Sequence, residues 1–112
     1  MSASEDSWTE KLAGLRADYA RDLPDKLAEI QAGWRTHLES PTAATHGDLV
    51  RRVHNLAGTG ATFGLPAISE CARALERFLH DVVGTDPARA AGHDAGFQDH
   101  FGRLVEAGQR RV

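Results

Sequence analysis

The chain has 112 residues, of which 41% are hydrophobic and 26% are charged, with a formal net charge of -3 and one cysteine. This size and composition indicate a single globular domain over residues 1–112 that can bury a core without metal or disulfide support. The slightly negative net charge gives no positive electrostatic potential that would attract nucleic acid, and a single cysteine excludes an internal disulfide. No signal peptide or run of about 18 apolar residues is present, so we expect a cytoplasmic protein that does not enter a membrane.

The first predicted helix begins near Trp8, after a polar segment at residues 1–6 that we expect to be flexible. Ser7 and Glu10 match a capping box, in which the two side chains satisfy free backbone donors at a helix start. Because proline disfavours an α conformation in the residue before it, Pro24 predicts a break or kink that ends this helix. Its apolar stripe consists of Trp8, Leu12, Leu15, Tyr19 and Leu23.

Two more helices are predicted between Pro24 and Gly64, separated by a loop at residues 40–44. The second helix begins at the proline, and the third begins at a capping box that pairs Thr45 with Asp48. Gly64 lies where a left-handed C-cap is expected, so it ends the third helix. The apolar face of the second helix consists of Leu27, Ile30, Trp34 and Leu38.

The remaining helices are predicted after Pro66 and after Pro87, because proline suits the first turn of a helix. A stop at Gly84 separates them. The last helix has low helix propensity, because it includes Gly92, Gly96 and Gly102, so tertiary packing must hold it. The apolar positions are Ile68, Ala72, Leu75, Leu79 and Val82 in the fourth helix and Ala90, Phe97, Phe101 and Leu104 in the last.

An all-α fold follows from these elements. No segment shows the strict alternation or the enrichment in β-branched residues that is typical of a strand. Short connections between successive amphipathic helices favour antiparallel neighbours packed at about 20°. The sequence therefore predicts an antiparallel, up-down-up-down four-helix bundle, with an additional N-terminal helix that caps or extends one end.

One histidine of the third helix is predicted to lie on its exposed face. At about 100° per residue, His54 falls on one side of this helix, in line with Arg51 and Gly58, and the apolar positions fall on the other. These apolar positions are Leu49, Val53, Leu56, Gly60 and Phe63. A glycine at position 58 costs about 1 kcal/mol of helix propensity relative to alanine, so helix stability does not explain it. Without a side chain there, a partner can approach the imidazole closely. The predicted partner-binding residues are Val50, Arg51, Ala57, Gly58 and Ala61.

A set of spaced residues covers this helix and the next, and consists of His54, Leu56, Gly58, Gly64, Ile68, Leu75 and Glu76. The set resembles the signature of histidine-containing phosphotransfer (HPt) domains, and the segment 19–27 is similar to the start of the bundle in many such domains. The resemblance implies the same fold, with His54 as the residue that accepts a phosphoryl group. It also implies the partners, which are response-regulator receiver domains and a hybrid sensor histidine kinase.

The chemistry expected of His54 is nucleophilic attack. An unperturbed histidine has a pKa of about 6.5, so an exposed imidazole is mostly neutral at physiological pH. Attack by a ring nitrogen on an aspartyl phosphate gives a phosphohistidine, and the reverse step passes the group to another aspartate. We therefore expect a covalent carrier in the phosphorelay of a two-component regulatory system, rather than a turnover enzyme. The resemblance implies that the receiver domain brings the Mg²⁺, and no cofactor of the chain's own is expected.

One position departs from the family pattern. Ala57 stands three residues after the histidine, where the family usually carries lysine, so the usual positive charge is absent. Arg51, one turn before His54, is a candidate to supply part of this charge, and a solvated arginine is the simpler alternative. The same departure motivates a second hypothesis, an adaptor that is not phosphorylated and that binds and sequesters a receiver or kinase domain.

The other histidines predict no metal site. None of them forms the pairing at i and i+4, together with a third ligand, that a zinc site needs. A hydrolase or metal protein that uses them is therefore the least supported interpretation. They are His37, His46, His80, His93 and His100.

Overall fold

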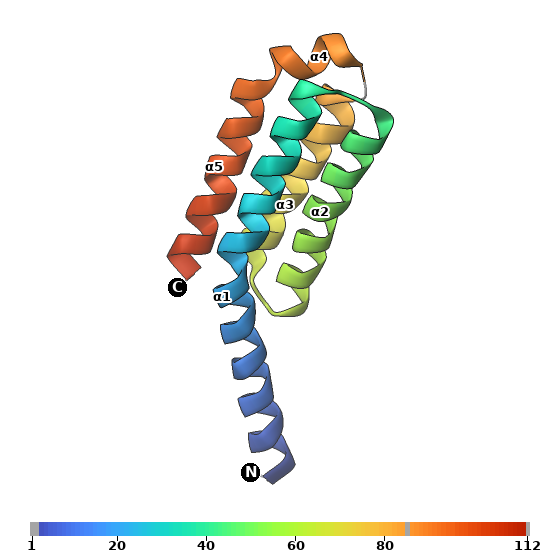
Figure 1. Ribbon diagram of the computed structural model, residues 1–112. Coiled ribbons are helices and arrows are strands. Elements are labelled where there is room, and N and C mark those ends of the chain that lie inside the picture. The colour runs from blue at the N-terminus through green and yellow to red at the C-terminus, as the bar shows by residue number, and fades with distance from the viewer. Residues whose placement is uncertain (1–2, 85, 112) are drawn as a thin grey trace.

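The computed structural model describes residues 3–84 and 86–111, and no strand occurs among them. Its elements are α1 (Ala3–Glu39), α2 (Ala43–Thr62), α3 (Pro66–Phe78), the π-helical turn η1 (Leu79–Val83), α4 (Pro87–Gly92) and α5 (Asp94–Arg111). Figure 1 shows the second half of α1 in a bundle with α2, α3 and α5, with successive long helices antiparallel and α4 crossing one end. Both α1 and α3 pack against α2 and α5, so α1 and α3 lie diagonally across the bundle. The predicted all-α, four-helix bundle is confirmed.

Helix α1 is continuous, which corrects two predictions about the N-terminal part of the chain. It runs from Ala3 with Pro24 inside it, so it neither begins near Trp8 at a capping box nor breaks at the proline. A proline inside a helix costs about 3 kcal/mol. Leu23 before it and Ile30 after it are buried in the bundle, and burial of each such side chain contributes about 1.5–3 kcal/mol. Tertiary packing on both sides of the proline therefore offsets its cost.

The N-terminal part of α1 extends past the end of the bundle, as Figure 1 shows. Trp8 is 64% exposed and Leu15 is 47% exposed, although Tyr19 and Leu23 of the same apolar stripe are buried. The predicted extension of one end is therefore present, but as part of α1 rather than as an additional helix. Of the segment 1–6, residues 1–2 lie outside the described residues, and α1 begins within the rest. No helix in the described ranges is long and apolar enough to cross a membrane.

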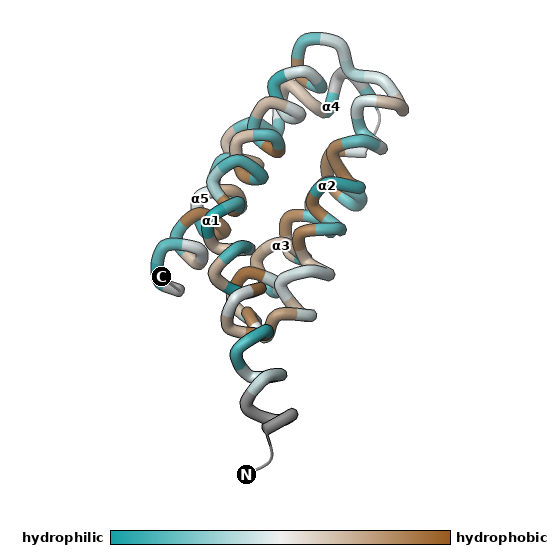
Figure 2. The backbone as a smooth tube through the Cα atoms, turned by 60° about the horizontal axis from the view of Figure 1, so that its bottom comes forward, coloured by the Kyte–Doolittle hydropathy of each residue, from teal (hydrophilic) through white to brown (hydrophobic). Residues whose placement is uncertain are grey.

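The core lies between the apolar faces of these helices, and Figure 2 shows hydrophobic and hydrophilic residues following one another along each helix as amphipathic helices require. Trp34 of α1 stacks on Phe97 of α5, with ring centroids 4.3 Å apart, and its indole N–H donates to Asp94 Oδ1 at 2.7 Å. That hydrogen bond is the largest of the causes that lower the pKa of Asp94. Besides Tyr19 and Leu23, the predicted apolar positions that are buried are Ile30, Trp34, Leu49, Val53, Leu56, Ile68, Ala72, Leu75, Leu79, Ala90, Phe97 and Leu104.

Helix α2 begins with a capping box, as predicted, but this box lies three residues earlier than the predicted pair Thr45 and Asp48. Thr42 is the N-cap, and its hydroxyl accepts the backbone N–H of Thr45 while the Thr45 hydroxyl accepts the backbone N–H of Thr42, both at 3.0 Å. Thr45 is therefore the third helical residue rather than the cap. The end of the helix is as predicted, since Gly64 has a φ of 69° and Pro66 opens α3.

A π-helical turn changes the end of the fourth predicted helix. The N–H of Gly84 donates to the carbonyl of Leu79 at 3.0 Å, a bond that spans five residues rather than four. The extra residue rotates the next side chain into the core, so Val83 is buried and the predicted Val82 is only half-buried. The last predicted helix is also divided, because α4 ends at Gly92 and α5 begins at Asp94.

Two buried histidines pack where α1 ends and α2 begins. His37 is fully buried, with Nδ1 2.7 Å from the hydroxyl oxygen of Thr45 and no hydrogen-bond partner for Nε2 among the described residues. The ring of His46 lies 5.8 Å from it, and its Nε2–H donates to the carbonyl of Leu79 at 2.8 Å. Burial, followed by the charge of His46, lowers the pKa of His37. The fold therefore favours a neutral His37.

This burial predicts a loss of stability in mild acid. The folded state holds the pKa of His37 below 6.5, so its stabilising effect is complete above about pH 6.5 and is lost as the pH falls through the lower, folded pKa. We expect the free energy of unfolding, measured by urea denaturation between pH 7 and pH 5, to fall less steeply in His37→Phe than in the wild type. Substitution of the exposed His80 by glutamine is the control, and equal slopes in His37→Phe and the wild type would contradict the prediction.

Candidate functional site

His54 lies on the exposed side of α2, at the edge that faces α3. Its neighbours Val53 and Leu56 are buried in the core, and the side chain of His54 itself is 69% exposed. This is the arrangement that the helical spacing predicted. The imidazole is therefore attached to a rigid helix while its ring remains accessible to another molecule.

Glu76 of α3 holds the imidazole in one orientation. Its Oε2 lies 2.9 Å from Nδ1 of His54, and its side chain is 20% exposed. A carboxylate only accepts hydrogen bonds, so Nδ1 carries the proton in this contact and Nε2 carries the lone pair. Among the described residues, nothing forms a hydrogen bond with Nε2. The pair thus presents a nucleophilic nitrogen to solvent.

Small side chains bring α3 close enough to α2 for this contact. A Cβ atom at Gly60 would lie 3.3 Å from the backbone nitrogen of Ser69, which is tighter than most such contacts. The buried hydroxyl of Ser69 donates to the carbonyl of Ala57 at 2.9 Å. These contacts fix the position of α3 along α2, and the side chains of His54 and Glu76 meet across the two helices. Glu76 belonged to the matched pattern, but spacing along the chain does not show which side chains of two helices come into contact, so Glu76 could not be assigned to the site.

The predicted partner-binding residues differ in their exposure. Gly58 and Ala61 are exposed, and a Cβ atom at Gly58 would meet nothing within 4 Å. Val50 is half-buried against the core. Ala57 is only 3% exposed, so the prediction that its side chain lies on the binding surface is wrong. The hydroxyl of Ser69 on α3 donates to the carbonyl of Ala57, so α3 packs closely against α2 at this residue.

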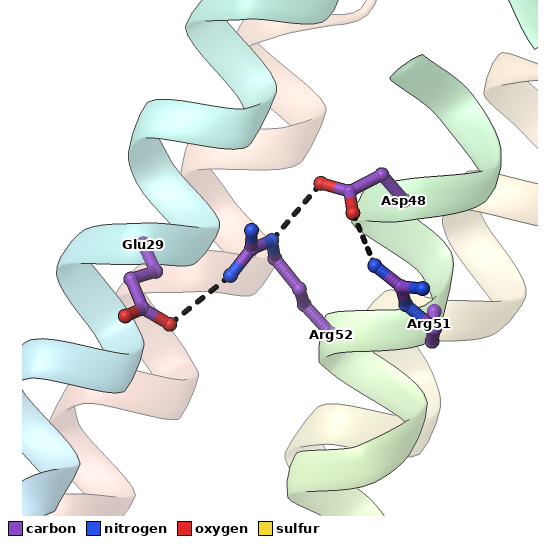
Figure 3. Close-up of polar contacts among 4 residues, drawn as sticks. All are labelled: Glu29, Asp48, Arg51 and Arg52. Atoms are coloured by element: carbon purple, nitrogen blue, oxygen red, sulfur yellow. Dashed lines mark hydrogen bonds and ion pairs between the residues drawn. The ribbon is translucent and has the colours of Figure 1, made fainter. Parts of the chain in front are cut away.

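Arg51 is directed away from His54. Figure 3 shows its guanidinium on Asp48, where Nη2 lies 2.5 Å from Oδ1, and Arg52 bridges the other oxygen of Asp48 to Glu29 of α1 at 3.0 and 3.1 Å. The hydrogen bond from Arg52 is the largest cause of the lowered pKa of Asp48. The charges of both arginines are therefore matched by carboxylates, and the structure does not direct Arg51 toward a group on His54.

The other histidines take part in ring packing. His80 packs edge-on against His46 with centroids 6.0 Å apart, while His93 and His100 both contact Phe78. Within residues 3–84 and 86–111, no three histidine, cysteine, aspartate or glutamate side chains are grouped so that they could hold a metal ion.

Comparison with protein-family models gives a match over most of the chain. The family model described as "Hpt domain" matches residues 14–107, a span that begins in α1, ends in α5 and contains both His54 and Glu76. Searches of curated proteins and of solved structures gave no significant match.

Proposed function

The chain belongs to the Hpt domain family, whose members are histidine phosphotransfer modules of two-component signalling, and from this premise we propose that it is a phosphorelay carrier. His54 accepts a phosphoryl group from the aspartyl phosphate of one receiver domain and passes it to an aspartate of another. The observation that supports this most directly is the exposed imidazole whose Nδ1–H contacts Glu76 while Nε2 is left without a partner.

The transfer step follows from that geometry. The lone pair of Nε2 attacks phosphorus, an N–P bond forms, and the bond from phosphorus to the aspartyl oxygen breaks, so the aspartate leaves as a carboxylate. Positive charge develops on the ring during the attack, and the carboxylate of Glu76 stabilises it through Nδ1–H. The reverse step restores the neutral ring. We propose that the receiver domain supplies the Mg²⁺ that neutralises the phosphoryl oxygens.

The contribution of this chain is to position a nucleophile, so we propose a covalent carrier rather than a turnover enzyme. After one cycle of acceptance and donation the imidazole returns to its original state, and the reacting carboxylate and metal belong to the partner. The proposed partners are receiver domains and a hybrid sensor histidine kinase, which dock on the edge formed by α2 and α3 around His54. Gly58 and Ala61 leave the backbone of α2 open to close approach there.

Gly58 gives a test of this docking surface. Because a Cβ atom at Gly58 has open space, Gly58→Ala should raise the free energy of unfolding by about 0.5–1 kcal/mol and preserve transfer. Gly58→Trp should remain folded and slow transfer from a receiver, because the indole covers the approach to His54. Thermal denaturation and transfer rates measure the two effects. Gly102→Trp on α5, which is also open, is the matched control, and equal transfer by both tryptophan variants would contradict the proposed surface.

The second candidate function is an adaptor that binds a receiver or kinase domain without accepting phosphate. It is favoured by one observation, the lack of an unpaired cation on α2 beside His54, since position 57 is alanine and Arg51 is held by Asp48. An adaptor would form the complex with a receiver and leave the phosphate on the receiver's aspartate.

A direct experiment separates the two functions. Receiver domains from the same organism, phosphorylated with acetyl phosphate and Mg²⁺, are mixed with the protein, and label is followed in both components. A carrier gains acid-labile, alkali-stable label, as a phosphohistidine does, and passes it to a second receiver. A protein that binds these receivers and never gains label would be the adaptor.

A further inference from the structure

The α1 extension, residues 7–18, carries an apolar stripe that lies outside the core. Among the described side chains, Trp8 and Leu15 are the two large hydrophobic ones that are exposed, and Leu12 between them is half-buried. None of the three packs against the core, and Figure 1 shows this part of α1 projecting beyond the bundle. Helices in proteins are stabilised mainly by packing of an apolar face, and Gly14 lowers the helix propensity of the extension further. A partner that covers the stripe would therefore stabilise the α1 extension.

The stripe has the spacing of a coiled-coil seam. Its apolar residues follow one another at intervals of four, three and four residues, as the a and d positions of a coiled coil do. They are Trp8, Leu12, Leu15 and Tyr19. Tyr19 is buried in the bundle, and Nε–H of Arg16 donates to the carbonyl of Phe63 at 2.7 Å, which ties the base of the α1 extension to the turn between α2 and α3. The face that projects from the bundle therefore fits another amphipathic helix.

The charges beside the stripe match a second copy of the chain that runs antiparallel. At about 100° per residue, Lys11 and Asp18 lie on one edge of the stripe and Arg16 lies on the other. A two-fold axis between Leu12 and Leu15 sets each edge against the same edge of the other copy. Lys11 then lies within about 3 Å, along the helix axis, of the partner's Asp18. By symmetry the contact forms twice, so one interface contains two ion pairs.

A parallel second copy would bring like charges together. In a parallel coiled coil, a residue on one edge meets the partner's opposite edge five residues further along, so Lys11 would meet the partner's Arg16. In the antiparallel arrangement both charged groups are available. Lys11 has no partner in the described part of the chain. Asp18 is 60% exposed and pairs through Oδ1 with Arg21 of its own helix at 3.0 Å, which leaves Oδ2 open.

We propose that the α1 extension binds the same segment of a second copy of this chain and forms an antiparallel, two-fold symmetric dimer. Leu12 of each copy packs against the partner's Leu15, and Trp8 is level with the partner's Tyr19 at the end of the bundle. The interface is small, so the dimer is weak and depends on concentration. No residue of the α1 extension belongs to the site around His54, so the dimer is independent of the proposed function and leaves both imidazoles exposed.

Sedimentation equilibrium of the whole chain between about 1 µM and 1 mM tests the dimer. We expect the wild type to pass from monomer to dimer in this range. Trp8→Ala and Leu15→Ala should each weaken association about tenfold or more and leave the fold intact, because both side chains are exposed in the monomer.

A wild type that stays monomeric throughout, or a dimer that both variants retain, would overturn the proposal. A monomer whose binding to a receiver domain or to anionic lipid vesicles is lost in Trp8→Ala would assign the stripe to that occupant and would also overturn the dimer.

Charge reversal tests the antiparallel direction. Lys11→Glu and Asp18→Lys should each weaken association about tenfold, because each replaces two attractions with two repulsions, and the double variant should restore the wild-type dimer. Lys26→Glu, the same change further along α1, is the matched control and should associate as the wild type does. A double variant that is no stronger than the single variants, at equal helix content by circular dichroism, would overturn the antiparallel dimer.

Discussion

His54→Gln should abolish acid-labile phosphorylation of this protein by a phosphorylated receiver domain. Glutamine offers an amide of similar reach but no ring nitrogen with a basic lone pair, so no N–P bond can form. The side chain of His54 is 69% exposed, and substitutions at such positions usually change stability by less than about 0.5 kcal/mol. His54→Gln should therefore lose phosphorylation completely and keep the stability of the wild type.

The measurement follows label from the receiver to the carrier in the wild type and in His54→Gln. His80→Gln, which removes another exposed histidine, is the control and should still be labelled. Complex formation with the receiver should persist in His54→Gln, because the exposed surface around Gly58 and Ala61 is unchanged. Label that survives in His54→Gln would show that the phosphoryl group goes elsewhere.

Glu76→Ala should have the second largest effect, a decrease in the rate of transfer by about ten- to a hundredfold. Without the carboxylate, nothing holds the proton on Nδ1, the ring turns freely, and the positive charge that develops during attack loses its partner. Glu76→Gln should lie between Glu76→Ala and the wild type. Its amide oxygen can still accept the Nδ1–H hydrogen bond, but it carries no charge to stabilise the cationic ring.

Single-turnover transfer at saturating receiver measures this effect on chemistry apart from docking. The matched control is Glu70→Ala, which removes an exposed carboxylate from the same helix without touching His54. Transfer at the wild-type rate in Glu76→Ala would contradict the orienting role of Glu76. A decrease that appears only below saturation would assign Glu76 to docking instead.

Local periodicity explains what could be predicted from the sequence. A helix of 3.6 residues per turn fixes which residues share a face, so the exposure of His54 and the burial of Val53 and Leu56 followed from spacing alone. Gly64 and Pro66 mark the turn between α2 and α3 because each residue type has its own backbone preference.

Features that depend on packing between helices could not be predicted. The continuity of α1 through Pro24 depends on core residues on both sides of it, and the burial of Val83 depends on one π-helical turn. The site shows the same limit. Ala57 lies on the α3 side of its helix and is covered by it, and the pairing of Glu76 with His54 depends on how two helices are set against each other.

The measurement that tests the proposed carrier function most directly is the fate of the phosphate when the wild-type protein meets a phosphorylated receiver domain. The mixture is separated, the receiver is assayed for lost phosphate, and the carrier is digested under alkaline conditions and analysed by mass spectrometry. We predict that the receiver loses its phosphate and that the added phosphoryl mass maps to the peptide containing His54. A stable complex in which the receiver keeps its phosphate and His54 remains unmodified would contradict a carrier role.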